Sequence, residues 1–232
     1  MEENEINNES LIPINNDLVR VENSITITNK LIGEINYSKF KWWDLLEPEW
    51  KNIFYNQGAY KKAHNCFEPD YKQKDIPSNL NELELNEILN LETLYCDKST
   101  ITDFTPISRL TKLKYLFLNH TSLDSLKKIE FIIPNLLSIE LNSTKINSIS
   151  LLKSADNLEQ LSIYHCLINN LTPLADVKTL KNLYLSTSEE KIFMESVIGK
   201  KVDHYGFSKT EIQEFKKHNP LCIVINANGD KI

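Results

Sequence analysis

Residues 91–118 read LETLYCDKSTITDFTPISRLTKLKYLFL and contain one full unit of a pattern that repeats along the chain. Leu91 opens the first block, and leucines at matching positions open four more blocks, with steps of 22, 23, 22 and 22 residues. These later openers are Leu113, Leu136, Leu158 and Leu180. A period this regular indicates that one structural unit is built repeatedly and stacked on itself.

Apolar residues stand at the fourth and sixth positions of each block, and in four blocks also at the eleventh. The first block supplies Leu94, Cys96 and Ile101 at these places. Side chains alternate along a strand, so positions 4 and 6 would point inward and positions 3, 5 and 7 outward. Five parallel strands about 4.8 Å apart would present a face of roughly 20–25 Å. We interpret Cys96 and Cys166 as small core residues rather than nucleophiles.

The segments between the expected strands carry turn signals. FTPI at 104–107 and LTPL at 171–174 occupy matching positions, and we expect Thr to cap a short helical turn that starts with Pro. Position 9 holds mostly small polar residues, which can satisfy backbone groups at the inner bend. These residues are Ser99, Thr121, Thr144, Cys166 and Ser188.

This pattern resembles the leucine-rich repeat, and in particular its internalin-like class. The consensus of that class reads roughly LxxLxLxxTxIxDLTPLxxLxx, which ITDFTPISRL after Leu91 follows closely. The resemblance covers about residues 78–226. It implies an α/β solenoid with a parallel concave sheet, a helical N-terminal cap and a helix-strand C-terminal cap. It also implies protein binding, although the class binds many unrelated partners.

The domain organisation follows from these limits. We expect a disordered leader over 1–14, where Asn and Glu predominate, and a helical N-terminal region and cap over 15–77. The solenoid with its C-terminal cap would occupy 78–226, and a tail 227–232.

The N-terminal cap is expected around an aromatic segment. Trp43, Leu46, Trp50 and Phe54 are spaced for one helical face, and Pro48 suits the start of a second short helix. This unit could seal the open end of the solenoid, whose terminal repeat would otherwise expose an apolar face. Alternatively, its tryptophans could form a binding hot spot.

A further helix is expected over residues 78–90, with Leu80, Leu83 and Ile88 on its inner face. At the other end of the chain, a segment over 192–198 would be irregular or helical.

A helix and a strand are expected at the C-terminal end of the solenoid. Ser208 and Glu211 have capping-box spacing and predict a helix over 209–217. Residues 221–225 would form a last strand, so that a helix and a strand cover the end of the solenoid.

Composition narrows the functional classes. The net charge is −6 and arginine occurs only at Arg20 and Arg109, which argues against a nucleic-acid partner. We find neither a secretory signal nor an apolar run long enough for a membrane span. We therefore expect a cytoplasmic protein that keeps its four cysteines as thiols, with no membrane role, and the resemblance implies that it is bacterial. The oligomeric state is left open.

No motif in the sequence indicates catalysis, a cofactor or a metal. His120 and His165 share position 8 but lie two repeats apart, roughly 10 Å by strand spacing, so we interpret them as solvated loop residues. His64 and Cys66 are close in sequence, and a thiol–imidazole pair there is an alternative. In that alternative the protein is an effector or enzyme-associated protein with activity or targeting in the N-terminal region.

The outward strand positions carry five aromatic residues that burial of the core does not require. Three of them would cluster on the first two strands, and aromatic anchors are common hot spots of protein interfaces. The alternative is cross-strand packing that stabilises the sheet. We predict a non-enzymatic protein-interaction module whose partner binds this face. The predicted site is Tyr95, Asp97, Tyr115, Phe117, Asn119, Glu140, Asn142, Tyr164 and Tyr184.

Overall fold

The computed structural model describes residues 38–60, 76, 77 and 79–232. The chain divides into two compact units, Met1–Leu45 and Leu46–Ile232. In the first unit, residues 38–44 are helical and the side chain of Trp43 is buried. The second unit contains all the elements described below.

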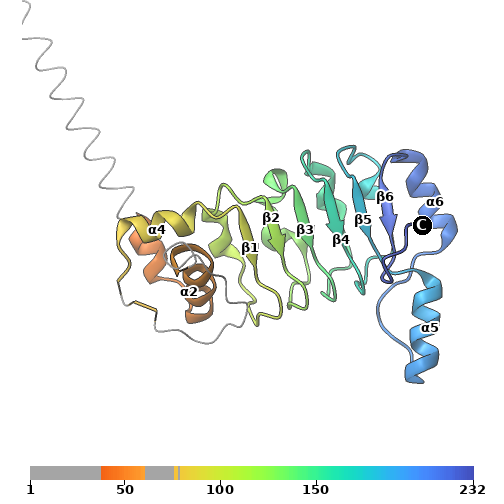
Figure 1. Ribbon diagram of the computed structural model, residues 1–232, viewed down its shortest axis with the longest axis horizontal. Helices are drawn as coiled ribbons and strands as arrows, with labels where there is room; N and C mark the ends of the chain where they lie inside the picture. Colours follow the sequence, from red (N-terminus) through yellow and green to blue (C-terminus); the bar gives the residue numbers. More distant parts are fainter. Residues whose placement is uncertain (1–37, 61–75, 78) are drawn as a thin grey trace, which may run out of the picture. The chain divides into compact units, whose positions relative to one another are not determined.

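A six-stranded parallel sheet forms the frame of this second unit, and its strands follow one another in sequence order (Figure 1). Equivalent block positions pair across the sheet, as Leu94 pairs with Leu116 and Leu116 with Ile139. The predicted repeat is therefore confirmed, and a sixth strand extends it. The strands are β1 (Thr93–Tyr95), β2 (Tyr115–Phe117), β3 (Ser138–Glu140), β4 (Gln160–Ser162), β5 (Asn182–Tyr184) and β6 (Ile223–Ile225).

The core lies behind the sheet, where the residues at positions 4 and 6 of all five blocks are buried. Cys96 and Cys166 belong to this core, and burial raises the pKa of both thiols. A thiol held protonated in apolar surroundings is a poor nucleophile. The interpretation of these two cysteines as core residues is confirmed.

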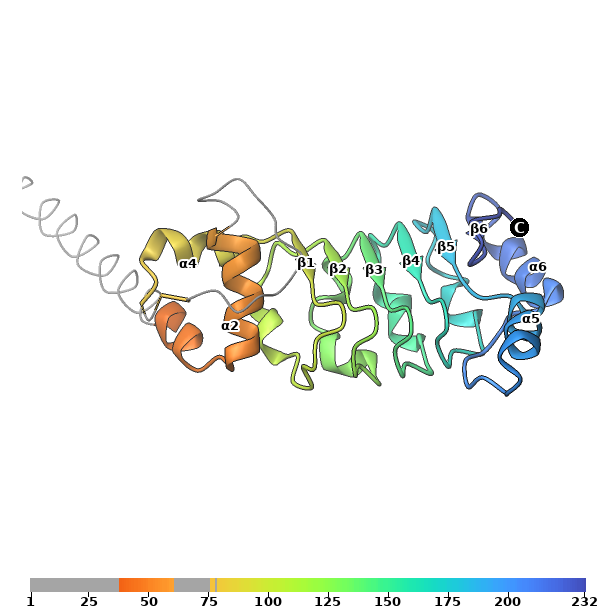
Figure 2. The same ribbon diagram turned by 60° about the horizontal axis from the view of Figure 1, so that its bottom comes forward.

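Short 3-10 turns return the chain on the side opposite the strands (Figure 2). Thr was expected to cap two of these turns, and that expectation was wrong. Asp103 accepts hydrogen bonds from both the amide and the hydroxyl of Thr105, which lower the pKa of its carboxyl, and Asn170 accepts from the amide of Thr172. In both turns, the side chain two residues before Thr accepts a hydrogen bond from the Thr amide. Thr itself lies inside the turn. The turns are η2 (Thr105–Arg109), η3 (Leu126–Ile129), η4 (Ile133–Asn135), η5 (Ser150–Ser154) and η6 (Thr172–Leu174).

The N-terminal end of the sheet is covered by α2 (Pro48–Tyr55), which has Pro48 in its first turn as predicted. Trp50 is only 1% exposed, and its indole Nε1 donates to the carbonyl of Asp103 at 2.9 Å. Its ring stacks on Phe54 at 4.8 Å and meets Phe104 edge-on at 6.4 Å. Trp50 therefore seals the first repeat, and the cap interpretation is confirmed for it.

The π-helical turn η1 (Asn56–Tyr60) follows α2 and packs against α4 (Glu82–Leu89). A Cβ on Gly58 would lie 2.7 Å from the Ile88 side chain, so this close approach requires glycine.

The start of α4 differs from the prediction. The helix begins four residues late, because Asn81 and Glu84 form a capping box there. Leu80 and Ile88 are buried as expected, whereas Leu83 is 71% exposed and Leu85 takes its expected place in the core.

The C-terminal cap agrees with the sequence. The capping box of Ser208 and Glu211 starts α6 (Lys209–His218), which buries Ile212 and Phe215, and β6 then pairs with β5. Before it, α5 (Ser188–Ile198) runs from a capping box at Thr187 to Gly199, whose φ of 69° ends the helix. Among the described residues, every helix is too short or too polar to span a lipid bilayer.

Candidate functional site

The strongest candidate site is an aromatic pair on the outward face of β1 and β2, hereafter the sheet face. Tyr95 and Phe117 occupy paired positions, and their rings stack with centroids 4.4 Å apart and an interplanar angle of 15°. Tyr115 lies on the same face of β2 and is 38% exposed. These three residues thus cluster on adjacent strands, as the sequence predicted.

A second aromatic group lies toward the other end of the sheet. Tyr164 and Tyr184 meet edge-on at 6.1 Å, and the Tyr164 hydroxyl donates to the carbonyl of Asn226 at 2.7 Å. Burial, followed by the nearby Tyr184, raises the pKa of Tyr164 to about 12. Tyr164 is thus fixed to the C-terminal segment, and no periodic signal in the sequence predicts this bond. Ile223 and Ile225 of β6 continue the same face. Their strand was predicted from the sequence, but they were not included in the candidate site.

The polar residues at position 7 form a ladder that joins each repeat to the next. Asp97 accepts from the amide of Asn119 at 2.8 Å, and Asn119 accepts from the amide of Asn142 at 3.0 Å. Asn142 in turn accepts from the amide of Tyr164 at 2.8 Å. These side chains hold the strand ends in register, so part of their hydrogen-bonding capacity is used within the protein.

Glu140 lies beside this ladder, and one of its carboxylate oxygens accepts a hydrogen bond from it. The side-chain amide of Asn119 donates to Glu140 at 2.9 Å and more weakly to Asp97 at 3.3 Å. This places two carboxylates on the sheet face next to the aromatic pair.

Gln57 covers the outer edge of β1 and was not singled out from the sequence. Its side-chain oxygen accepts from the amide of Tyr95 at 2.8 Å, and its side-chain nitrogen donates to the Tyr95 carbonyl at 2.6 Å. Gln57 is only 4% exposed. It pairs with β1 as a neighbouring strand would, which closes an edge that could recruit another chain. It also fixes the backbone that carries the Tyr95 ring.

A turn in the left-handed backbone region follows four of the strands. Position 8 has a φ of 60° at Lys98, 57° at His120, 57° at Ser143 and 55° at His165. None of these residues is glycine, and each residue in this region costs roughly 1–2 kcal/mol. Backbone bonds between repeats, such as Lys98 N–H to the Asn119 carbonyl at 2.8 Å, hold the turns.

Six parallel strands in sequence order and in one register, the first five of them joined by 3-10 turns, decide the architecture. The fold is that of a leucine-rich-repeat protein. No family model and no curated protein matches the chain.

Solved structures of such proteins are similar to it. Internalin C2 from Listeria monocytogenes has 23% identity over 64% of this chain and 69% of its own, with a TM-score of 0.40. A second Listeria monocytogenes internalin, inlF, has 18% identity over 62% of this chain and 49% of its own, with a TM-score of 0.42. A leucine-rich-repeat protein from Leptospira interrogans has 24% identity over 62% of this chain and 39% of its own, with a TM-score of 0.41. The chain thus spans less than half the length of the latter two proteins.

Two histidines that are distant in sequence meet at the end of the leucine-rich repeats. The rings of His165 and His204 lie 4.7 Å apart, and burial lowers the pKa of both. The expectation of a solvated His165 was wrong, because the segment that follows α5 covers it. His120 stays exposed. The described residues hold no group of three or more His, Cys, Asp or Glu that could bind a metal ion. His64 and Cys66 lie outside the described residues.

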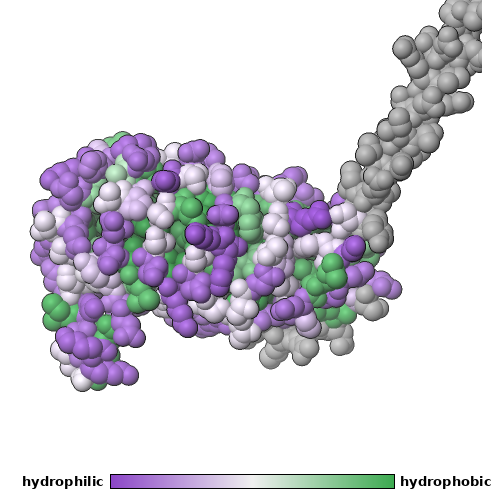
Figure 3. All heavy atoms as spheres, turned by 180° about the vertical axis from the view of Figure 1, so that it is seen from behind, coloured by the Kyte–Doolittle hydropathy of each residue, from purple (hydrophilic) through white to green (hydrophobic). Residues whose placement is uncertain are grey.

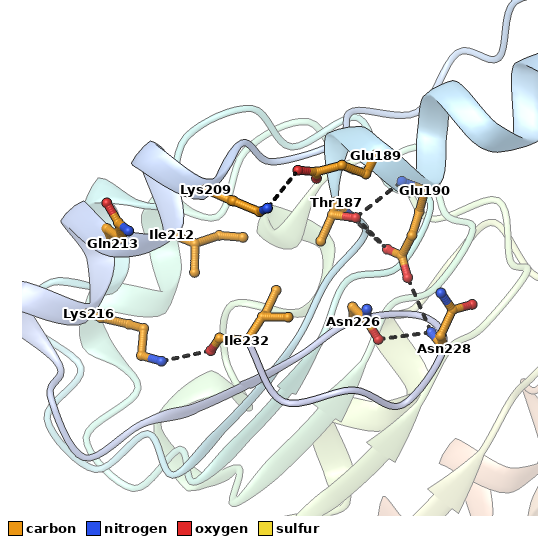
Figure 4. A pocket seen from close by; sticks show the side chains of 10 residues that line it. All are labelled: Thr187, Glu189, Glu190, Lys209, Ile212, Gln213, Lys216, Asn226, Asn228 and Ile232. Carbon is orange, nitrogen blue, oxygen red and sulfur yellow. Dashed lines mark hydrogen bonds and ion pairs between the residues drawn. The ribbon is translucent and has the colours of Figure 1, made fainter.

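A cavity of about 520 Å³ lies between the start of α5, α6 and the last residues (Figure 4). Its polar groups largely pair with one another. Lys209 is 3.6 Å from Glu189, and Lys216 donates to the Ile232 carbonyl at 2.7 Å. Glu190 accepts from the amide of Asn228 at 3.2 Å. This arrangement supports the C-terminal cap and aligns no nucleophile with a base.

Proposed function

We propose that this leucine-rich-repeat protein is a non-enzymatic interaction module that binds a protein partner on its sheet face. The observation that carries the proposal is the stacked pair of Tyr95 and Phe117. Both rings are half-buried on the face turned away from the core, while residues such as Leu94 and Leu116 fill the core behind them. Large aromatic side chains in such positions supply much of the binding energy at protein interfaces.

The rigidity of this face supports the proposal. Gln57 fixes the Tyr95 backbone from one side, and the Asp97–Asn119 bond fixes the strand ends. A surface that is already ordered loses little conformational freedom on binding, so more of the contact energy appears as affinity. A net charge of −6 favours a protein over a nucleic acid as the partner.

The predicted site residues take different roles in this proposal. Tyr95, Tyr115 and Phe117 are the anchors, and Glu140 provides a polar contact at their edge. Asp97, Asn119 and Asn142 act mainly through the ladder, by positioning the strands that carry the anchors. Tyr164 and Tyr184 form a second contact area beside β6.

Site-specific photo-crosslinking tests the proposal. A photoreactive phenylalanine analogue at Tyr115 should capture a discrete protein in the native cell. The same analogue at Phe131 is a matched control, because Phe131 is 42% exposed between η3 and η4, away from the sheet face. Adducts of the same size and yield at both positions would contradict the proposal.

A further inference from the structure

The helix α5 is exceptional in how little of it is covered. None of its 11 residues is fully buried. Figure 3 shows it standing away from the rest of the repeats, at the lower left, with hydrophobic residues on its surface. An isolated helix shorter than about 12–15 residues is marginally stable in water, and most helices gain their stability by packing an apolar face.

The hydrogen bonds between α5 and the rest of the described residues lie near its two ends. At the start, the amide of Ser188 donates to the Phe207 carbonyl at 2.9 Å, and Thr187 caps the helix. At the end, Glu195 accepts from the amide of Val202 at 3.1 Å and pairs with Lys201 at 2.8 Å. Both ends are thus fixed to the return segment, and the middle of the helix is held out as a projection.

The outer face of this projection is apolar. Ile192, Phe193 and Val197 are 66%, 71% and 68% exposed, and Ser196 lies between them on the same face. Phe193 and Val197 are four residues apart and Ile192 is next to Phe193, so the three apolar side chains share one side of the helix, which normally packs against another element. The small Ser196 would let a second helix approach closely.

The charges along α5 select the orientation of that second element. Glu189 and Glu190 lie in the first turn, and Lys200 and Lys201 follow directly after the end of the helix at Gly199. A second α5 in antiparallel orientation would place each acidic end beside the other copy's basic end, and it would also oppose the two helix dipoles favourably. A parallel pair would place like charges together.

We propose that α5 is a self-association element, through which two copies of this chain form a two-fold symmetric dimer by antiparallel packing of their α5 helices. With the axis near residues 194 and 195, Phe193 of each copy packs against Val197 of the other. Each Glu189 then lies beside Lys200 of the other copy, while Lys201 keeps its pair with Glu195 of its own copy. A membrane surface fits less well, because residues 188–201 carry three acidic and three basic side chains and so have no net attraction to anionic lipids.

Sedimentation of the full chain over micromolar to millimolar concentrations tests this directly. We expect a concentration-dependent dimer that Phe193→Ser converts to a monomer. The matched control is Leu83→Ser, because Leu83 is also 71% exposed and also lies on a helix, α4. The Leu83→Ser protein should dimerise as the wild type does. A wild type that is monomeric throughout, or equal loss of the dimer in both variants, would overturn the proposal.

Charge reversal tests the orientation. Glu189→Lys or Lys200→Glu alone should weaken the dimer by roughly two- to five-fold for each ion pair lost. The two changes together should restore it, because the pairs re-form with opposite sign. Additive weakening in the double variant would overturn the antiparallel arrangement.

Disulfide trapping fixes the register. A Phe193→Cys chain mixed with a Val197→Cys chain, both carrying Cys66→Ser, should form a mixed disulfide faster than either chain alone. The thiols of Cys96, Cys166 and Cys222 are buried and do not compete. Faster cross-linking of either chain with itself would show a parallel or shifted pairing and overturn the proposed one.

Discussion

The ring of Phe117 lies almost parallel to the ring of Tyr95, with centroids 4.4 Å apart, although the residues belong to different repeats. The two residues pair across β1 and β2, so the repeat period itself places one ring on the other. The stack belongs to the surface, since inward-pointing leucines fill the core without it. Its contribution to stability should therefore be small compared with its contribution to binding.

The stack can be measured by a double-mutant cycle. We expect a coupling free energy of about 0.5–1.5 kcal/mol between Tyr95→Ala and Phe117→Ala, as for other aromatic pairs. Denaturant unfolding of the wild type, both single variants and the double variant gives this value. A double variant that is unfolded at room temperature would assign the rings to the core instead.

The ladder at position 7 should be important for stability. Asn142→Ala removes the acceptor for the Tyr164 amide and for the Ser162 hydroxyl, so we expect the free energy of unfolding to fall by about 1–3 kcal/mol. Asn142→Asp keeps an acceptor oxygen at the same place and should lose less. Equal stability of the alanine variant and the wild type in urea unfolding would refute this role.

Gln57 should protect the edge of β1. Gln57→Leu removes the side chain that bonds both the amide and the carbonyl of Tyr95, and we expect a loss of about 1–3 kcal/mol in unfolding free energy. Light scattering should also show growing assemblies, because the strand edge becomes open to other chains. The same change at the exposed Gln213 is the control and should alter stability by no more than about 0.5 kcal/mol. A monodisperse Gln57→Leu protein would argue against edge protection.

The paired histidines should make stability fall in mild acid. Burial lowers the pKa of His165 and His204 in the folded protein, so the unfolded chain binds protons first as the pH drops below about 6.5. His120 lowers the pKa of His165 further, and Glu190 raises it. Lys191 likewise lowers the pKa of His204, and Glu195 raises it.

Thermal unfolding between pH 7 and pH 5 measures this decline. The variant with His165→Asn and His204→Gln should show a shallower decline, and Asn tolerates the left-handed backbone at position 165. The exposed His218→Gln should keep the wild-type profile. An unchanged decline in the double variant would assign the acid sensitivity to other groups.

The sequence predicted most of the fold because the determining residues repeat. Leu94, Leu116 and their equivalents recur at a fixed step, and alternation along a strand then separates core from surface. The C-terminal helix was also predictable, because Ser208 and Glu211 form a local capping box whose partners are three residues apart.

The contacts that were missed join residues with no shared periodicity. Gln57 reaches Tyr95 across 38 residues, and nothing in its neighbours distinguishes it from a surface glutamine. His204 meets His165 through an irregular segment. Leu83 was misassigned because it lies five residues from Ile88 and so on another side of α4, whereas Leu85 lies three residues from Ile88 and shares its buried face. The site's aromatic residues were therefore predictable, whereas the bonds that hold them in place were not.

Affinity capture from the native cell lysate tests whether the sheet face binds a protein through Tyr95 and Phe117. The wild type is compared with the Tyr95→Ala, Phe117→Ala double variant and with Phe131→Ala, whose exposed ring lies off the sheet face. All three proteins are first shown to be folded by thermal unfolding. We predict one protein that is recovered by the wild type and by Phe131→Ala and lost with the double variant. Equal recovery of the same protein by the folded double variant would contradict the claim.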